Sequence, residues 1–341
     1  MPTPTIPAGN LFMNATLWTG NGTSQTITNG ASGASFQPDF VWLKSRSSGT
    51  NFHNLYDVNR GATKYLFSNS TSAEGTNAQA LTSFNSNGFS VGNDNDVNQS
   101  SGSYVGWNWK AGGTAVTNTA GTITSSVSAN TTSGFSVVTY TGNGTSGATV
   151  GHGLGVTPAM IIVKNRSGAN YWIVQHQSLT SVTYNLYLND TSNQQNDGQF
   201  QAKSSSTFTL TGGGSVNINS NNFVAYCWAP IAGYSAFGSY TGNGSSDGPF
   251  TYLGFRPRFI MFKRTDSTGS WFMEDSSRGT YNVMGPELYA NDSGAEATVS
   301  RLDFLSNGFK MRAANAGDNA NGGTYIYMAF AENPFKYANA R

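Results

Sequence analysis

Large apolar and small residues alternate with a period of two in three stretches of the chain. A period of two is typical of β-strands, whose successive side chains point to opposite faces of a sheet. The pattern therefore predicts three strands, each with a face of large side chains and a face of small ones that lets another layer approach closely. The large residues are Val105, Trp107 and Trp109, then Val224, Tyr226 and Trp228, then Ile326, Met328 and Phe330; Gly106, Ala225 and Ala329 are the small ones.

A second pattern is a continuous apolar run that begins at a proline and ends at a lysine six residues later. It occurs at 38–44, 158–164 and 257–263. Short runs rich in β-branched and aromatic residues are typical of strands that are buried on both faces. A proline at the first position costs such a strand no hydrogen bond of the ladder.

A third pattern is a turn, in which an aromatic residue precedes Thr-Gly-Asn-Gly at 18–22, 140–144 and 240–244. Gly and Asn tolerate the positive φ angles of tight turns. The patterns recur at about 100 residues, the size of a small domain. We therefore expect an all-β chain made by internal triplication, with three tandem antiparallel β-sandwich domains of jelly-roll-like form.

The repeated blocks also suggest where the domains begin and end. We expect the second and third domains to contact each other closely and the first to be freer, because an uncharged stretch without aromatic residues follows the first. That stretch is a linker or a long surface strand. The expected parts are an N-terminal arm at 1–14, domain 1 at 15–113, the linker at 114–134, domain 2 at 135–234 and domain 3 at 235–341.

Composition narrows the function. Charged residues make up 10% of the chain, the formal net charge is +1 and no basic stripe is present, so we expect no nucleic-acid partner. No apolar run approaches the roughly 20 residues of a membrane helix, and residues 1–16 lack the features of a signal peptide. A single cysteine, Cys227, excludes an intrachain disulfide and is best interpreted as a small buried side chain.

Few residues are arranged for chemistry, and we expect neither enzymatic activity nor a cofactor. The three histidines do not recur at equivalent positions, and the neighbouring carboxylates of Glu274 and Asp275 would point to opposite faces of a strand. Asp-x-x-Arg-Gly occurs at Asp57 and Arg60 and again at Asp275 and Arg278. It is either a ligand clamp or, as we prefer, a loop in which Asp accepts local hydrogen bonds.

A weak calcium candidate consists of Asp94, Asp96 and Asn98, which open like an EF-hand loop. The loop then lacks the glycine and the final glutamate that an EF-hand needs, so a turn rich in Asp and Asn is the better interpretation.

Seven tryptophans raise the possibility of sugar binding, but six of them recur inside the strand blocks, where a shared core is the simpler explanation. Trp18, which precedes the first turn, is the one we expect to be partly exposed. The candidate binding residues, for all of which a structural role is also open, are Trp18, Asn21, Asn143, Asn243, Asp57, Arg60, Asp275 and Arg278.

Together the blocks resemble a domain of unknown function that recurs in virion structural proteins of tailed phages, especially phages of cyanobacteria and marine bacteria. The resemblance rests on the three patterns above, on Arg-Gly-Ala-Thr-Lys at 60–64, on the Ser-Asn-Gly-Phe turns at 86–89 and 306–309, and on the segments 105–113 and 327–335. It implies a particle protein, made in the host cytoplasm and located in the virion, with other tail, baseplate or capsid proteins as partners.

Three functions follow from this resemblance and from the composition. The first is a tail fibre or receptor-binding adhesin, which would contact a host-surface glycan through polar loops and form a homo-oligomer, in our expectation a trimer. The second is a head decoration protein, favoured by the short segment before the first domain. The third, a glycan-processing enzyme, lacks a usable acid and base.

Overall fold

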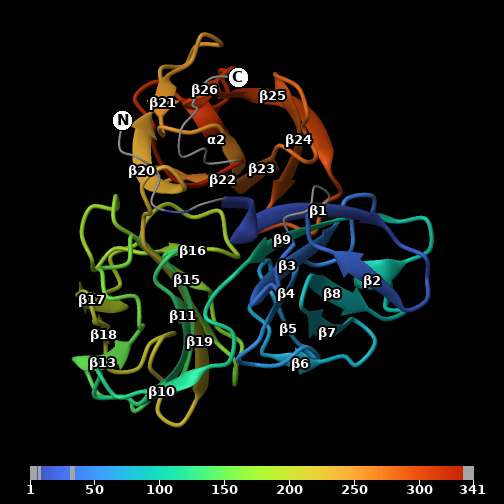
Figure 1. Ribbon diagram of the computed structural model, residues 1–341. Coiled ribbons are helices and arrows are strands. Elements are labelled where there is room, and N and C mark those ends of the chain that lie inside the picture. Colours follow the sequence, from blue (N-terminus) through green and yellow to red (C-terminus); the bar gives the residue numbers. More distant parts are fainter. Residues whose placement is uncertain (1–5, 7–8, 31–34, 333–341) are drawn as a thin grey trace.

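The computed structural model describes residue 6, residues 9–30 and residues 35–332, and it is nearly all β (Figure 1). Only part of the predicted arm falls within the described residues; it holds a 3-10 turn, η1 (Gly9–Leu11), and the start of the first strand. The two α-helices of the described part are single turns, α1 (Asn95–Asn98) and α2 (Ala316–Asn319). No helix among the described residues is long and apolar enough to cross a membrane.

Three large antiparallel sheets contain the predicted strands. In spatial order the first consists of β1 (Met13–Thr19), β9 (Ser103–Trp109), β3 (Phe40–Ser45), β4 (Asn54–Asp57), β5 (Lys64–Phe67) and β6 (Gly75–Thr76). The second consists of β10 (Val116–Asn118), β11 (Ser125–Asn130), β12 (Phe135–Thr141), β19 (Asn222–Trp228), β14 (Met160–Asn165), β15 (Ile173–His176) and β16 (Leu186–Tyr187). The third consists of β20 (Ser235–Thr241), β27 (Thr324–Ala331), β22 (Pro257–Arg264), β23 (Trp271–Asp275), β24 (Met284–Tyr289), β25 (Ala297–Leu305), β26 (Gly308–Met311) and β21 (Phe250–Tyr252).

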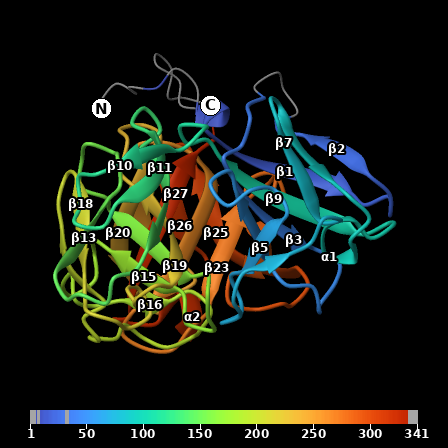
Figure 2. The same cartoon turned by 90° about the horizontal axis from the view of Figure 1, so that it is seen from below.

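Each large sheet is covered on its outer side by a smaller layer. Over the first sheet lie β2 (Gln25–Thr28), β8 (Gly88–Val91) and β7 (Leu81–Asn85), and over the second lie β13 (Ala148–Gly151), β18 (Thr207–Leu210) and β17 (Phe200–Lys203). In the third sheet, β25, β26 and β21 continue the sheet and fold back over it. Figures 1 and 2 both place β13 and β18 on one flank of the molecule and β2 and β7 on the other. We call strands β1–β9, β10–β19 and β20–β27 the first, second and third units.

The inner faces of the three large sheets share one hydrophobic core. Trp109 of the first unit packs against Trp228 of the second and Phe330 of the third, with ring centroids 6.1 and 5.7 Å apart. Phe40 of the first unit stacks on Tyr226 of the second at 4.2 Å. The first unit is therefore held as closely as the others, and the expectation that it is freer is wrong.

The predicted alternation of faces is confirmed. The large residues of β9, β19 and β27 all point into the central core. In β3, Phe40 and Trp42 face the centre whereas Val41 and Leu43 face the outer layer, so this strand is buried on both sides. The small residues allow the outer layer to approach: a Cβ on Gly106 would lie 3.0 Å from Leu43.

The segment 114–134 is more than a linker. It contains β10 and β11, and β11 pairs along its whole length with β12. The second sheet is thereby extended beyond the repeated blocks. Of the two alternatives, a linker or a long surface strand, the structure therefore favours the strand, but as two separate strands. Ser, Thr and Ala fill most of them, so the alternation of apolar residues is too weak to give their bounds.

Candidate functional site

The lysine that ends each apolar run lies buried between two units. Lys44, Lys164 and Lys263 have no exposed surface, and each ammonium group donates hydrogen bonds to backbone carbonyl oxygens, one of them in a neighbouring unit. The inter-unit bonds are Lys44 Nζ to Ser293 O (2.9 Å), Lys164 Nζ to Thr71 O (2.8 Å) and Lys263 Nζ to Thr191 O (3.1 Å). The first unit thus binds the third, the second binds the first and the third binds the second, so the three contacts close a ring.

A backbone hydrogen bond accompanies each lysine, two residues further along the strand. The three bonds are Glu296 N to Arg46 O (2.9 Å), Glu74 N to Arg166 O (3.0 Å) and Gln194 N to Thr265 O (2.9 Å). Two of the three contacts also carry an ion pair across the units, Arg46 with Glu296 at 2.7 Å and Arg166 with Glu74 at 2.8 Å. We call each lysine with its accompanying bonds an inter-unit joint.

Burial without a carboxylate partner lowers the pKa of Lys164 to about 7, and burial lowers the pKa values of Lys44 and Lys263 to about 8. An unfolded lysine has a pKa near 10.4, so between about pH 7 and pH 10 each of these three lysines binds more protons in the unfolded chain than in the folded one. The contribution of these three lysines to the free energy of unfolding therefore rises with pH in this window.

We expect this rise to be smaller in Lys164→Met, which keeps the apolar stem and removes the titrating group. Each unit of pKa difference corresponds to about 1.4 kcal/mol, so the two proteins should differ in slope by an amount that urea denaturation at pH 7, 8.5 and 10 resolves. Equal slopes for wild type and variant would mean that Lys164 is not buried as described.

The two Asp-x-x-Arg-Gly loops lie in the interior at the same contacts. Both side chains of the Asp57–Arg60 pair and of the Asp275–Arg278 pair are fully buried. Tyr226 of the second unit donates to Asp57 at 2.8 Å, and the indole of Trp107 of the first unit donates to Asp275 at 2.9 Å. Because these four candidate residues offer no surface to a ligand, the preferred interpretation as a structural loop holds.

The contact between the second and third units has a histidine where the other two contacts have the aspartate of a buried Asp–Arg pair. His176 occupies the position of the two aspartates, and its Nε2 lies 3.1 Å from the carbonyl oxygen of Tyr327 in the third unit. Burial lowers the pKa of His176 to about 3, so the ring is neutral. A carbonyl can only accept, so Nε2 carries the proton, and Nδ1 accepts from the backbone of Ser178 at 3.1 Å.

The three Thr-Gly-Asn-Gly turns are each held by a buried asparagine from later in the same unit. Asn98, Asn217 and Asn319 are fully buried; each accepts a hydrogen bond from the backbone N–H of the turn asparagine, at 3.1, 2.9 and 2.9 Å. The side chains of Asn21, Asn143 and Asn243 are exposed, but each accepts a hydrogen bond from the backbone two residues later. Their amide oxygens thus stabilise the turn, and each side chain keeps an exposed surface.

The two glycines of each turn serve different purposes. The second, such as Gly144, has a positive φ of 69°. The first glycine of the turn does not have a positive φ. At that position a Cβ on Gly142 would lie 2.4 Å from the carbonyl oxygen of Ile218. Close backbone approach, and not a positive φ, therefore requires the first glycine.

Gly142→Val is expected to lower the free energy of unfolding by roughly 3 kcal/mol, the upper part of the range for overpacking, because the obstructing atoms belong to the backbone. Gly49→Ala is the matched control, since its Cβ would meet only an ordinary contact of 3.6 Å. Thermal and urea denaturation of both variants measure the effect. A Gly142→Val protein with the melting temperature of the wild type would refute this account of the turn.

The weak calcium candidate is built differently from an EF-hand. Asp94 caps helix α1, accepting from the backbone of Asp96 at 2.9 Å, and the amide oxygen of Asn98 accepts from Asn21 and from Gln25. These oxygens are already used within the protein. Among the described residues, no group of three or more His, Cys, Asp or Glu side chains converges on a metal position.

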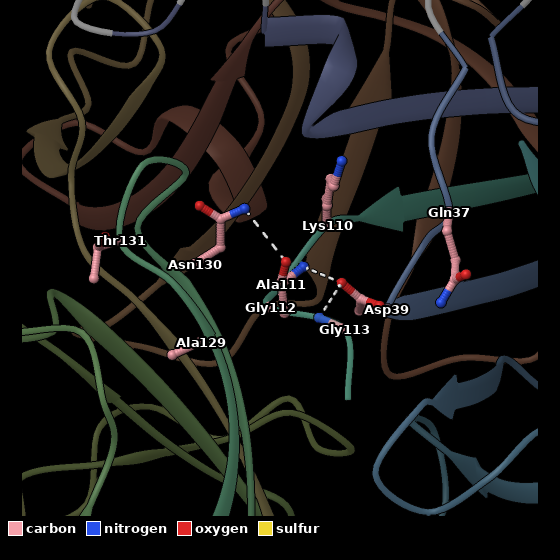
Figure 3. A pocket seen from close by; sticks show the side chains of 9 residues that line it. All are labelled: Gln37, Asp39, Lys110, Ala111, Gly112, Gly113, Ala129, Asn130 and Thr131. Atoms are coloured by element: carbon pink, nitrogen blue, oxygen red, sulfur yellow. Dashed lines mark hydrogen bonds between the residues drawn. The ribbon is translucent and has the colours of Figure 1, made fainter. Parts of the chain in front are cut away.

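A cavity of about 510 Å³ lies where the first and second units meet (Figure 3). Asp39 accepts hydrogen bonds at its floor from the backbone of Ala111 at 2.7 Å and Gly113 at 3.2 Å, and burial raises the pKa of its carboxyl group. Figure 3 shows the Lys110 side chain pointing away from Asp39. Asp39 is the single carboxylic acid and Lys110 the single amine among the lining residues. The lining of the cavity consists of Gln37, Asp39, Lys110, Ala111, Gly112, Gly113, Ala129, Asn130 and Thr131.

Comparison of the sequence with known proteins identifies its family. The model of the family described as Domain of unknown function (DUF7483) matches residues 8–334. The chain belongs to the DUF7483 family. A search of the curated proteins and a search of the solved structures give no match. The DUF7483 match runs through all three units, as does the central core.

The tryptophans of this DUF7483 protein follow the prediction. Trp18 is half-buried, its indole donates to Val97 O at 3.2 Å and its ring stacks on Tyr104. Cys227 is buried as expected, and burial raises the pKa of its thiol to about 12, far from that of a nucleophile. The six tryptophans of the strand blocks are all buried: Trp42, Trp107, Trp109, Trp172, Trp228 and Trp271.

Sequence reasoning missed the structural role of the lysines and of the buried asparagines in this DUF7483 chain. The recurrence of lysine six residues after proline was a usable signal, because an exposed lysine has no reason to recur at a fixed place. The buried asparagines carry a weaker sequence signal. Valine precedes two of them, at 97–98 and 216–217, but Asp318 precedes Asn319.

Proposed function

We propose that this protein is a structural component of a tailed-phage virion, in the tail fibre or receptor-binding class. The observation that carries the proposal is the closed ring of inter-unit joints. The recurring charged residues lie in the interior and fix the three units to one another, which suits a protein that must keep its shape on a particle. The resemblance of the repeated motifs to those of tailed-phage virion proteins supports the same function.

We further propose that the chain arose by triplication and that each unit is a jelly-roll-like β-sandwich. The strand orders β1-β9-β3-β4, β12-β19-β14-β15 and β20-β27-β22-β23 correspond one to one. Each unit also has an outer layer packed on its large sheet through a core of its own. The joints and the buried asparagines recur at corresponding positions of all three.

The proposed activity is binding without a chemical step. Exposed polar loops would contact a glycan on the host surface, each with low affinity, and the many copies on a particle would raise the overall avidity. A homotrimer would multiply the sites further. Light scattering of the purified protein measures its mass in solution, and a monomer at micromolar concentration would remove the trimer from the proposal.

Cryo-electron microscopy of the intact particle tests the proposed function. The three units, joined by the ring of contacts, can be fitted to density as one rigid body, so the position of the protein on the particle is identifiable at moderate resolution. We expect it at the tail or baseplate, with loops directed outward. A particle without this density would refute the proposal.

One observation favours a second candidate, a head decoration protein. Three similar units surround a common centre, so a single chain offers an approximately threefold arrangement to a surface (Figure 1). Such a body suits a local threefold position of a capsid shell. Density in icosahedral register on the head would select this candidate over the adhesin.

A further inference from the structure

Two aromatic side chains stand on the outer face of strand β21, the last strand of the third sheet. Phe250 is 44% exposed and Tyr252 is 53% exposed, and the intervening Thr251 points inward and is buried. Strand β21 lies at the periphery of the third unit (Figure 1). Large exposed aromatic side chains at positions i and i+2 of a strand form a continuous surface on one face.

The other two units have small residues at the corresponding positions. Thr251 is paired with Phe309, as Ile27 is paired with Phe89 and Val150 with Phe208, and this register aligns the three strands. The core common to the units therefore does not require aromatic residues here. The counterparts of Phe250 and Tyr252 are Thr26 and Thr28 in the first unit and Thr149 and Gly151 in the second.

A structural role alone does not explain why residues 250 and 252 are both aromatic. The ring of Phe250 lies over Gly308 of the neighbouring strand, where a Cβ would approach it to 3.0 Å, and an aromatic residue can stabilise such a glycine. In the first unit, Gly88 occupies the place of Gly308 without an aromatic neighbour on that side. Tyr252 lies beside Gly254, where a Cβ would meet its hydroxyl group at 3.5 Å, an ordinary contact with a residue of the following loop and not a ring laid over a glycine of the neighbouring strand.

Charged side chains of both signs border the two rings on the same face. Lys310 is opposite Phe250 in the ladder and forms an ion pair of 2.6 Å with Asp247, whose side chain is 82% exposed. Asp303 is opposite Lys310 on the next strand and pairs with Arg312 at 3.2 Å. The border therefore offers hydrogen-bond donors and acceptors, while its positive and negative charges balance.

We propose that this surface, formed by Phe250, Tyr252, Lys310, Asp247, Asp303 and Arg312 and called the aromatic ledge, binds a neutral hexopyranose. The C–H groups on one face of a pyranose ring carry partial positive charge and pack on the negative face of an aromatic ring. The hydroxyl groups at the edge of the sugar both donate and accept, which matches carboxylates beside an ammonium group. Balanced charge gives no preference for an acidic sugar.

The inference rests on the proposed function, because it names the class of glycan that the adhesin would bind. A single exposed site of this kind gives weak binding, with a dissociation constant on the order of 1 mM. Attachment would then depend on the number of copies that the particle presents.

The test compares the wild type with Phe250→Thr/Tyr252→Thr, which restores the residue type found in the first unit and should fold normally. An array of neutral and uronic-acid-containing hexose oligosaccharides is the probe, and saturation-transfer NMR with the bound members confirms contact. We expect binding of neutral members and a loss of about tenfold or more in the double variant. Tyr171→Ala, at a 43% exposed tyrosine of the second unit, is the control and should retain binding.

Several results would overturn the inference: no binding by the wild type, binding of acidic members alone, or unchanged binding by the double variant. A dimer of the wild type that the double variant abolishes would show that the ledge covers a second copy instead. Failure of the proposed function is separable from these results. A ledge that binds sugar in a protein absent from the particle refutes the virion proposal alone, whereas a particle protein without sugar binding refutes the ledge alone.

Discussion

Asp275→Asn is expected to lower the free energy of unfolding by about 3–5 kcal/mol, the range for removing one partner of a buried ion pair. Arg278 would remain buried with its principal counter-charge gone, because the pair has no exposed side-chain surface. The indole of Trp107 in the first unit would also lose its charged acceptor. Since this contact joins the first and third units, the loss should weaken their association as well as the loop itself. Urea denaturation at neutral pH measures the change.

Asp247→Asn provides the control for the loss of charge. Asp247 also pairs with a basic residue, Lys310, but its side chain is 82% exposed. Solvent screens an exposed ion pair so that it contributes little to stability, and this variant should unfold much as the wild type does. If both aspartates gave the same small effect, the buried position of Asp275 between two units would be wrong.

Trp109→Ala is expected to destabilise the protein by about 3–5 kcal/mol, as is usual when a large aromatic side chain is removed from a core. The ring contacts all three units, with Phe40, Trp228, and both Phe259 and Phe330 within 6.1 Å of it. The resulting cavity lies at the centre, so every unit loses packing. We therefore expect one transition shifted to lower temperature, and not the separate melting of the first unit.

Trp18→Ala is the matched control, because it removes the same side chain from a half-buried site within the first unit. Its ring contacts Tyr104 and Phe89, which belong to that unit alone. A smaller loss of stability is expected. If Trp109→Ala melted only the first unit and left the signals of the other two unchanged, the central core would not be shared.

Strands β9, β19 and β27 were predictable because each carries a period-two pattern that depends on local chemistry alone. Val105, Trp107 and Trp109 identify one face of β9 from the sequence, and recurrence in three places shows that the face is buried. The sequence does not say what buries it. That face could pack within its own unit or against the others, and the contact between Trp109 and Trp228 follows only from the three-dimensional arrangement.

The inter-unit joints were hidden for a related reason. Lysine is rarely buried, so Lys44 at the end of an apolar run is naturally interpreted as the point where a strand reaches solvent. Its partners are backbone carbonyl oxygens, such as that of Ser293, which any residue can supply and which leave no trace in the sequence. The Asp57–Arg60 loop was predictable as a local structure, but its bond to Tyr226 was not.

Calorimetric unfolding of the intact chain tests most directly the claim that the three units form one body through the central core and the ring of joints. Chains well above about 150 residues often unfold in several steps, so cooperative behaviour here would be informative. The account predicts a single heat-absorption peak whose calorimetric and van't Hoff enthalpies agree. Two or three resolved peaks, or a van't Hoff enthalpy near one third of the calorimetric value, would contradict it and would mean that the units unfold independently.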